Sequence, residues 1–99
     1  MNDACICNYN RVLFDLSLIR ASFILLDPNE RDADLISNLV DRYTRAVSLI
    51  EDVILHRVFE LLYLQGLSRE ECAARMNCDR RTIYRYNQSL VSLLCSLNV

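Results

Sequence analysis

Residues 67–94 read LSREECAARMNCDRRTIYRYNQSLVSLL, a pattern that predicts two helices joined by a tight turn. Gly66, directly before them, follows an apolar run, where a glycine can adopt the left-handed conformation that ends a helix. The preceding helix should therefore stop at this glycine or one residue before it. Ser68 and Glu71 have the spacing of a capping box, in which each side chain accepts from the other residue's backbone N–H. A new helix should therefore begin at Arg69.

Asn77 and Asp79 mark the turn and the start of the second helix. Asparagine tolerates positive φ better than any residue except glycine, which suits a turn. Asp79 is a good N-cap, because its carboxylate accepts from free N–H groups at the positive end of the helix dipole. The second helix should then run from Arg80. The predicted buried residues are Cys72, Ala73, Met76 and Cys78 before it, and Ile83, Asn87 or Tyr86, Leu90, Leu94 and Leu97 within it.

The outer face of this second helix carries side chains that can reach phosphates or base edges of DNA. A solvated face normally mixes charges of both signs, whereas these arginines cluster with only Asp79 nearby, already used as a cap. An ordinary solvated face remains the alternative. Tyr86 is expected to pack inside and Tyr84 to face outward. The predicted DNA-facing residues are Arg80, Arg81, Tyr84, Arg85 and Gln88, with Arg69 and Arg75 holding phosphates.

The segment 61–94, LLYLQGLSREECAARMNCDRRTIYRYNQSLVSLL, resembles the helix-turn-helix of sigma factor region four and, still more closely, small phage regulators of the ArpU type. Glu71–Ala73 matches the E-I-A signature of these families, and Arg81–Arg85 matches the R-x-T-V-Y-R signature. Cys72 replaces the usual isoleucine, and Asn77–Asp79 replaces a Gly-apolar-Ser turn, but both changes keep the physical role. The resemblance implies sequence-specific DNA binding in transcription control, often linked to phages or prophages.

The length of 99 residues predicts one domain and leaves no room for a second domain that binds polymerase or melts a promoter. One Gly, one Pro and the lack of alternating runs favour an all-α fold. We expect an N-terminal helical hairpin with one long helix, followed by a helix-turn-helix of the sigma region four type. Within the single domain 1–99, residues 1–60 would support and dimerise the protein, and residues 61–99 would bind DNA.

The net charge of −2 is unevenly spread along the chain. Residues 1–26 hold two acids and two arginines, residues 27–60 eight acids and four arginines, and residues 61–99 three acids and five arginines, which gives 0, −4 and +2. This distribution suits a protein that contacts a polyanion with one face. A single subunit would neutralise few phosphates, so it should bind double-stranded DNA weakly, and dimerisation would double their number.

The N-terminal apolar segment, residues 5–26, is interrupted by charged residues, which excludes a membrane span, and it lacks the features of a signal peptide. A cytoplasmic protein is therefore expected. One helical stripe consists of Val12, Leu16, Ile19, Phe23 and Leu26, and further apolar side chains on neighbouring faces are Leu13, Phe14, Leu18, Ile24 and Leu25. This excess over one intramolecular contact predicts a homodimer, in which this helix and the apolar seam of the next one pair across subunits as well as within one; a monomer with surface leucines is the alternative.

The chain breaks at Asp27–Glu30, where Asp27 can cap a second helix, although that helix could start as late as Asp34. A break near residues 48–53 stays open, because a helix of about thirty residues is unusual in a small domain. The apolar seam of the second helix comprises Ile36, Val40, Tyr43, Val47, Ile50, Ile54 and Leu61.

Neither metal binding nor catalysis is predicted. The cysteines at 5, 7, 72, 78 and 95 do not form the paired clusters of a zinc site, so small apolar filler is expected, and no cofactor. His56 and Glu60 share a helix face, but a lone histidine there is more often a packing or surface residue. No nucleophile with a partner base and no glycine-rich phosphate loop is present, which argues against an enzyme.

Two other functions fit the same sequence. The fold could serve as a protein-interaction module, an adaptor that binds RNA polymerase or a sigma factor without contacting DNA. It could also belong to a phage packaging or assembly factor, in which a helix-turn-helix serves a nucleoprotein scaffold.

Overall fold

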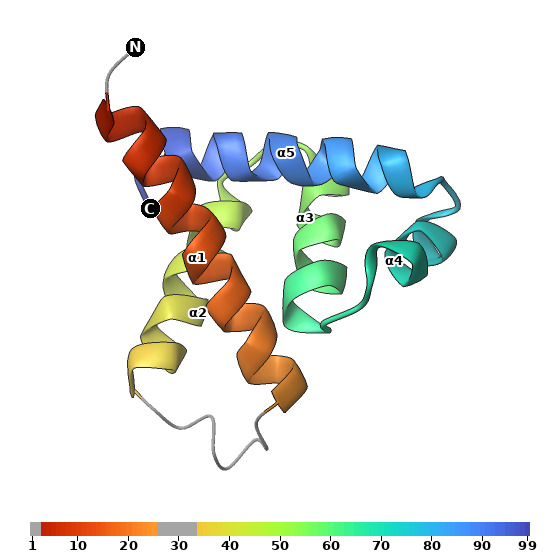
Figure 1. The fold of residues 1–99 in the computed structure, drawn as a ribbon, viewed down its shortest axis with the longest axis horizontal. Helices are drawn as coiled ribbons and strands as arrows, with labels where there is room; N and C mark the ends of the chain where they lie inside the picture. Colours follow the sequence, from red (N-terminus) through yellow and green to blue (C-terminus); the bar gives the residue numbers. More distant parts are fainter. Residues whose placement is uncertain (1–2, 26–33) are drawn as a thin grey trace.

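The protein is described by a computed structural model covering residues 3–25 and 34–99, with side chains for residues 8–25 and 35–99 (Figure 1). Within these ranges every regular element is a helix, which confirms the predicted all-α fold. In chain order the elements are α1 (Asp3–Leu25), α2 (Asp34–Ser48), α3 (Val53–Phe59), the π-helical segment η1 (Glu60–Leu64), α4 (Arg69–Met76) and α5 (Arg80–Ser96).

The last helix, α5, holds the others together. It lies along one edge of the molecule, with α4 at its N-terminal end and α1 crossing near its C-terminal end (Figure 1). It packs against α1, α3 and α4, and α1 also contacts η1 and α2. The loop that precedes α4 is also close to α1, because Arg20 of α1 donates to the carbonyl oxygens of Gly66 and Leu67.

All the described helices contribute buried side chains to the core, and α1 and α5 each contribute one stripe. Val12, Leu16 and Ile19 are buried as predicted, and Phe23 packs partly against them, whereas Leu26 lies outside the described residues. The α5 residues Ile83, Leu90 and Leu94 have no exposed surface.

The prediction that Leu97 is buried is wrong, since this side chain is 41% exposed. Leu97 follows the last residue of α5 as its C-cap. Val91, which the predicted stripe lacks, is fully buried instead. α5 packs against several helices, α1, α2, α3 and α4, and so its buried face is wider than a single stripe.

The second helix, for which the sequence left both a continuous and a broken form open, is divided into α2 and α3. The break falls in the window 48–53 that the sequence left open. Asp52 starts α3 anew, because its Oδ1 accepts from the Ile54 backbone N–H at 2.9 Å. Ile54 of the predicted seam lies in the first turn of α3 and is exposed. Nε2 of His56 lies 2.5 Å from the Ile50 carbonyl oxygen, so this histidine links α3 to the segment between the two helices.

α2 is described from Asp34 onward, so the choice between a helix start near Asp27 and one at Asp34 lies outside the described residues. The proposed cap at Asp27–Glu30 lies outside the described residues. The seam residues Tyr43, Val47 and Ile50 are buried within the chain.

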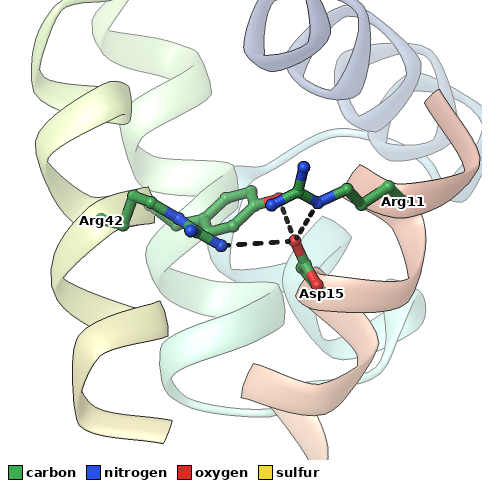
Figure 2. Close-up of polar contacts among 4 residues, drawn as sticks. Arg11, Asp15 and Arg42 are labelled. Atoms are coloured by element: carbon green, nitrogen blue, oxygen red, sulfur yellow. Dashed lines mark hydrogen bonds and ion pairs between the residues drawn. The ribbon is translucent and has the colours of Figure 1, made fainter. Parts of the chain in front are cut away.

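A buried polar contact joins α1 to α2 (Figure 2). The Tyr43 hydroxyl donates to Oδ2 of Asp15 at 2.6 Å, and both residues are buried. The guanidinium groups of Arg11 and Arg42 each lie 3.8 Å from the same oxygen. Burial is the main cause that raises the pKa of Tyr43 far above its ordinary value, and the hydrogen bond to the carboxylate raises it further. The hydroxyl therefore stays protonated and remains a donor.

Replacing Tyr43 by phenylalanine should lower the free energy of unfolding by about 1–3 kcal/mol, because a buried carboxylate then loses its donor. Urea denaturation measures this change. Tyr84→Phe is the matched control, since that tyrosine is 46% exposed and its loss of a hydroxyl should have little effect. Equal midpoints for Tyr43→Phe and the wild type would show that the contact contributes nothing.

Candidate nucleic-acid interface

Gly66 ends the helical run before α4, as predicted. Its φ is +69°, and the Leu67 backbone N–H reaches back to the Leu61 carbonyl at 3.0 Å. A Cβ at this position would also meet Cγ1 of Ile24, a residue of α1, at 2.5 Å. Both the backbone conformation and the close approach of α1 therefore require glycine here.

The capping box predicted at the start of α4 is confirmed. The Glu71 backbone N–H donates to Ser68 Oγ at 3.1 Å, and the Ser68 backbone N–H donates to Glu71 Oε1 at 3.0 Å. The latter hydrogen bond lowers the pKa of Glu71. Cys72 and Ala73 are buried and Met76 is half-buried against the core, which fixes the inner face of this short helix.

The turn and the start of α5 also follow the prediction. Asn77 has a φ of 60°, in the left-handed region. Oδ1 of Asp79 accepts from the Thr82 backbone N–H at 2.9 Å and from the Thr82 hydroxyl at 3.0 Å. Both hydrogen bonds lower the pKa of Asp79, and the bond from the backbone N–H has the larger effect. Ile83 is completely buried, so the opposite side of the first turns of α5 faces solvent.

Six of the seven predicted DNA-facing residues lie together around one shallow hollow of about 410 Å³ between α4 and α5. Tyr84 contacts two other residues of the hollow. Cζ of Arg69 is 5.2 Å from the tyrosine ring centroid, and Nε2 of Gln88 donates to the tyrosine hydroxyl at 3.3 Å. Arg75 is exposed on the last turn of α4 and does not line the hollow. This arginine hollow is lined by Arg69, Arg80, Arg81, Tyr84, Arg85 and Gln88.

The expectation that Asp79 is the only acid near these arginines is wrong. Oε1 of Glu70 lies 3.2 Å from Nη1 of Arg80. The two residues are ten positions apart, so no helical spacing indicates the pair. The turn between α4 and α5 brings them together.

Two further contacts hold the interface in place and have no signal in the sequence. Nη2 of Arg20, on α1, donates to the carbonyl oxygens of Gly66 and Leu67 at 3.3 and 3.4 Å. The Tyr63 hydroxyl donates to Oδ1 of Asn87 at 2.5 Å, which links η1 to α5. Burial raises the pKa of Tyr63. These residues line a second hollow of about 490 Å³, the Arg20 hollow, whose polar side chains are Arg20, Tyr63, Ser68, Arg69, Glu70, Arg80 and Asn87.

The described cysteines are part of the packing. Cys72 is fully buried, and burial raises the pKa of its thiol, whereas Cys78 and Cys95 are half-buried against the core. The side chains of Cys5 and Cys7 lie outside the described residues. Among the residues that the structure describes, no group of three His, Cys, Asp or Glu side chains is placed to hold a metal ion. Nor does any described helix combine the length and apolar character needed to cross a bilayer.

The two charged caps predict that stability falls in acid. Asp79 and Glu71 have folded-state pKa values below the ordinary 3.8 and 4.5, so their contribution is present above those values and is lost as the pH falls through the folded-state pKa. Asp79→Ser keeps an N-cap oxygen without its charge. This variant should have nearly the wild-type melting temperature at neutral pH. Between about pH 6 and pH 3 its melting temperature should fall less than that of the wild type. Circular dichroism melts measure both; identical pH profiles would contradict the assignment.

Comparison with known proteins gives one match to a family. The family model described as ECF sigma factor matches residues 12–91 of the chain, which includes most of α1 and nearly all of the helix-turn-helix. Comparison with curated proteins and with solved structures gives no match.

Proposed function

The chain belongs to the ECF sigma factor family, and from this membership we propose that it is a sequence-specific, DNA-binding regulator of transcription. Sigma factors are regulatory proteins rather than enzymes. The observation that carries the proposal is the arginine hollow: four arginines from α4 and α5 line it together with Tyr84 on an exposed face. A face of this kind suits the phosphates and base edges of a duplex.

In this proposal α5 is the recognition helix and its first turns enter the major groove. Residues 61–99 contact DNA and residues 1–60 support them. Arginine and glutamine can make paired hydrogen bonds to guanine and adenine edges, and tyrosine offers a hydroxyl and a flat apolar face. The groove-facing residues are Arg80, Arg81, Tyr84, Arg85 and Gln88, and Arg69 and Arg75 hold phosphates on either side.

Replacing Arg81 or Arg85 by alanine should weaken specific DNA binding by about 1–3 kcal/mol, with nearly unchanged melting temperature, because both side chains are exposed. The duplex would first be selected from a random pool, and affinity would be measured by fluorescence anisotropy at stated salt. Arg45→Ala, an exposed arginine in the last turn of α2, is the matched control and should bind like the wild type.

Loss of helicity in the Arg81 and Arg85 variants would instead make these residues structural. Failure of the random pool to yield any bound duplex, together with salt-independent binding to RNA polymerase or to a sigma factor, would favour the protein-interaction module. A role in transcription, RNA polymerase as a further partner, a cytoplasmic location and a phage origin of the ArpU type are parts of the same proposal.

A homodimer is the second part of the proposal, and its support is the outer face of α1. Phe14 is 62% exposed there, with Leu13 and Leu18 beside it also exposed. The seam of α2 contributes to the core of its own chain, so α1 is the better candidate for the contact between subunits. Two subunits would present two recognition helices and neutralise twice as many phosphates.

Phe14→Glu should convert the dimer to a monomer, because a charge at the centre of an apolar contact is costly to bury. Light scattering coupled to size exclusion at micromolar concentration measures the mass. Leu35→Glu, an exposed leucine on α2, is the control and should leave the mass of the dimer unchanged. A monomeric mass for the wild type would remove this part of the proposal and leave DNA recognition standing.

A further inference from the structure

The ion pair between Glu70 and Arg80 places a carboxylate beside an arginine of the proposed DNA-binding face. The distance of 3.2 Å from Oε1 to Nη1 is within hydrogen-bonding range. Carboxylate and phosphate present the same kind of anionic oxygens to a guanidinium group. Arg80 in the free chain therefore already holds an anion, and that anion is supplied by α4.

Arg80 stands between the two hollows. It lines the arginine hollow with Arg81 and Arg85, and it also lines the Arg20 hollow, where Glu70 lies. Both members of the pair are mostly exposed, at 67% for Arg80 and 77% for Glu70. Exposed ion pairs are weak and screened by salt, so the carboxylate can be exchanged for another anion without disturbing the fold.

We propose that Glu70 is an intramolecular competitor of the DNA backbone, which holds Arg80 in the free chain and is replaced by a backbone phosphate when a duplex binds. This inference rests on the proposed function and assigns Arg80, among the groove-facing residues, to the backbone. Phosphate contacts carry no sequence information. Glu70 therefore lowers the affinity for a duplex of any sequence and limits non-specific binding by this chain.

Glu70→Gln tests the proposal, because it keeps the shape of the side chain and removes its charge. Glu60→Gln is the matched control: Glu60 is also an exposed acid paired with an arginine, Arg57 at 3.7 Å, and it lines neither hollow. The probe is a fluorescent duplex of mixed sequence, about two helical turns long, titrated by anisotropy at several sodium chloride concentrations between about 50 and 200 mM.

Glu70→Gln should bind this duplex about three- to fivefold more tightly at the lowest salt. The slope of log affinity against log salt should also steepen, because salt screens the pair that Glu70 forms with Arg80 in the free wild-type chain, so the gain from Glu70→Gln is largest at the lowest salt. Glu60→Gln should behave like the wild type. In an Arg80→Ala background the gain from Glu70→Gln should disappear, because the glutamate acts through that arginine.

Equal gains for Glu70→Gln and Glu60→Gln, or a gain that survives Arg80→Ala, would reduce the effect to net charge and overturn the inference. If the wild-type chain binds the duplex and Glu70→Gln binds it with the same affinity, this inference is overturned and the proposed function stands. Absence of binding by the wild-type chain at every salt concentration would overturn the proposed function and this inference with it. Circular dichroism melts of all variants establish that each one is folded.

Discussion

The burial of one face of α5 is the constraint from which the rest of the interface follows. Ile83 and Leu90 have no exposed surface, and burying a side chain of this size contributes about 1.5–3 kcal/mol. Because residues three and four positions apart share a helix face, fixing Ile83 inside turns Arg81 and Arg85 outward. The clustering of arginines is therefore a consequence of packing on the other side of the same helix.

The N-terminal half of the chain contributes to this geometry directly. α1 contacts both η1 and α5, and its Arg20 donates to the two carbonyl oxygens just before α4. Ile24 occupies the space that a side chain at position 66 would need. The buried bond between Asp15 and Tyr43 attaches α2 to the same helix. α1 therefore helps to hold the loop that leads into α4, although Arg20 and Gly66 are 46 residues apart in the chain.

The electrostatic character of the proposed face also depends on the fold. The chain as a whole is acidic, with a net charge of −2, yet the described part of α4 and α5 gathers four arginines around one hollow. The same folding brings Glu70 to Arg80. A helix-turn-helix is short enough that one exposed carboxylate changes its surface charge appreciably. The effect of that carboxylate depends on which side chain the fold places next to it.

The sequence by itself determined the local features. Gly66, the Ser68 and Glu71 box, Asn77 and the Asp79 cap behave as predicted, because each depends on the backbone conformation of a few neighbouring residues. Only the tertiary structure decided the break after Ser48, the exposure of Leu97, the pairing of Glu70 with Arg80, and the reach of Arg20 to the loop before α4. These depend on how helices distant in sequence cross one another, and the periodicity of a single helix holds no information about the angle at which the next one packs.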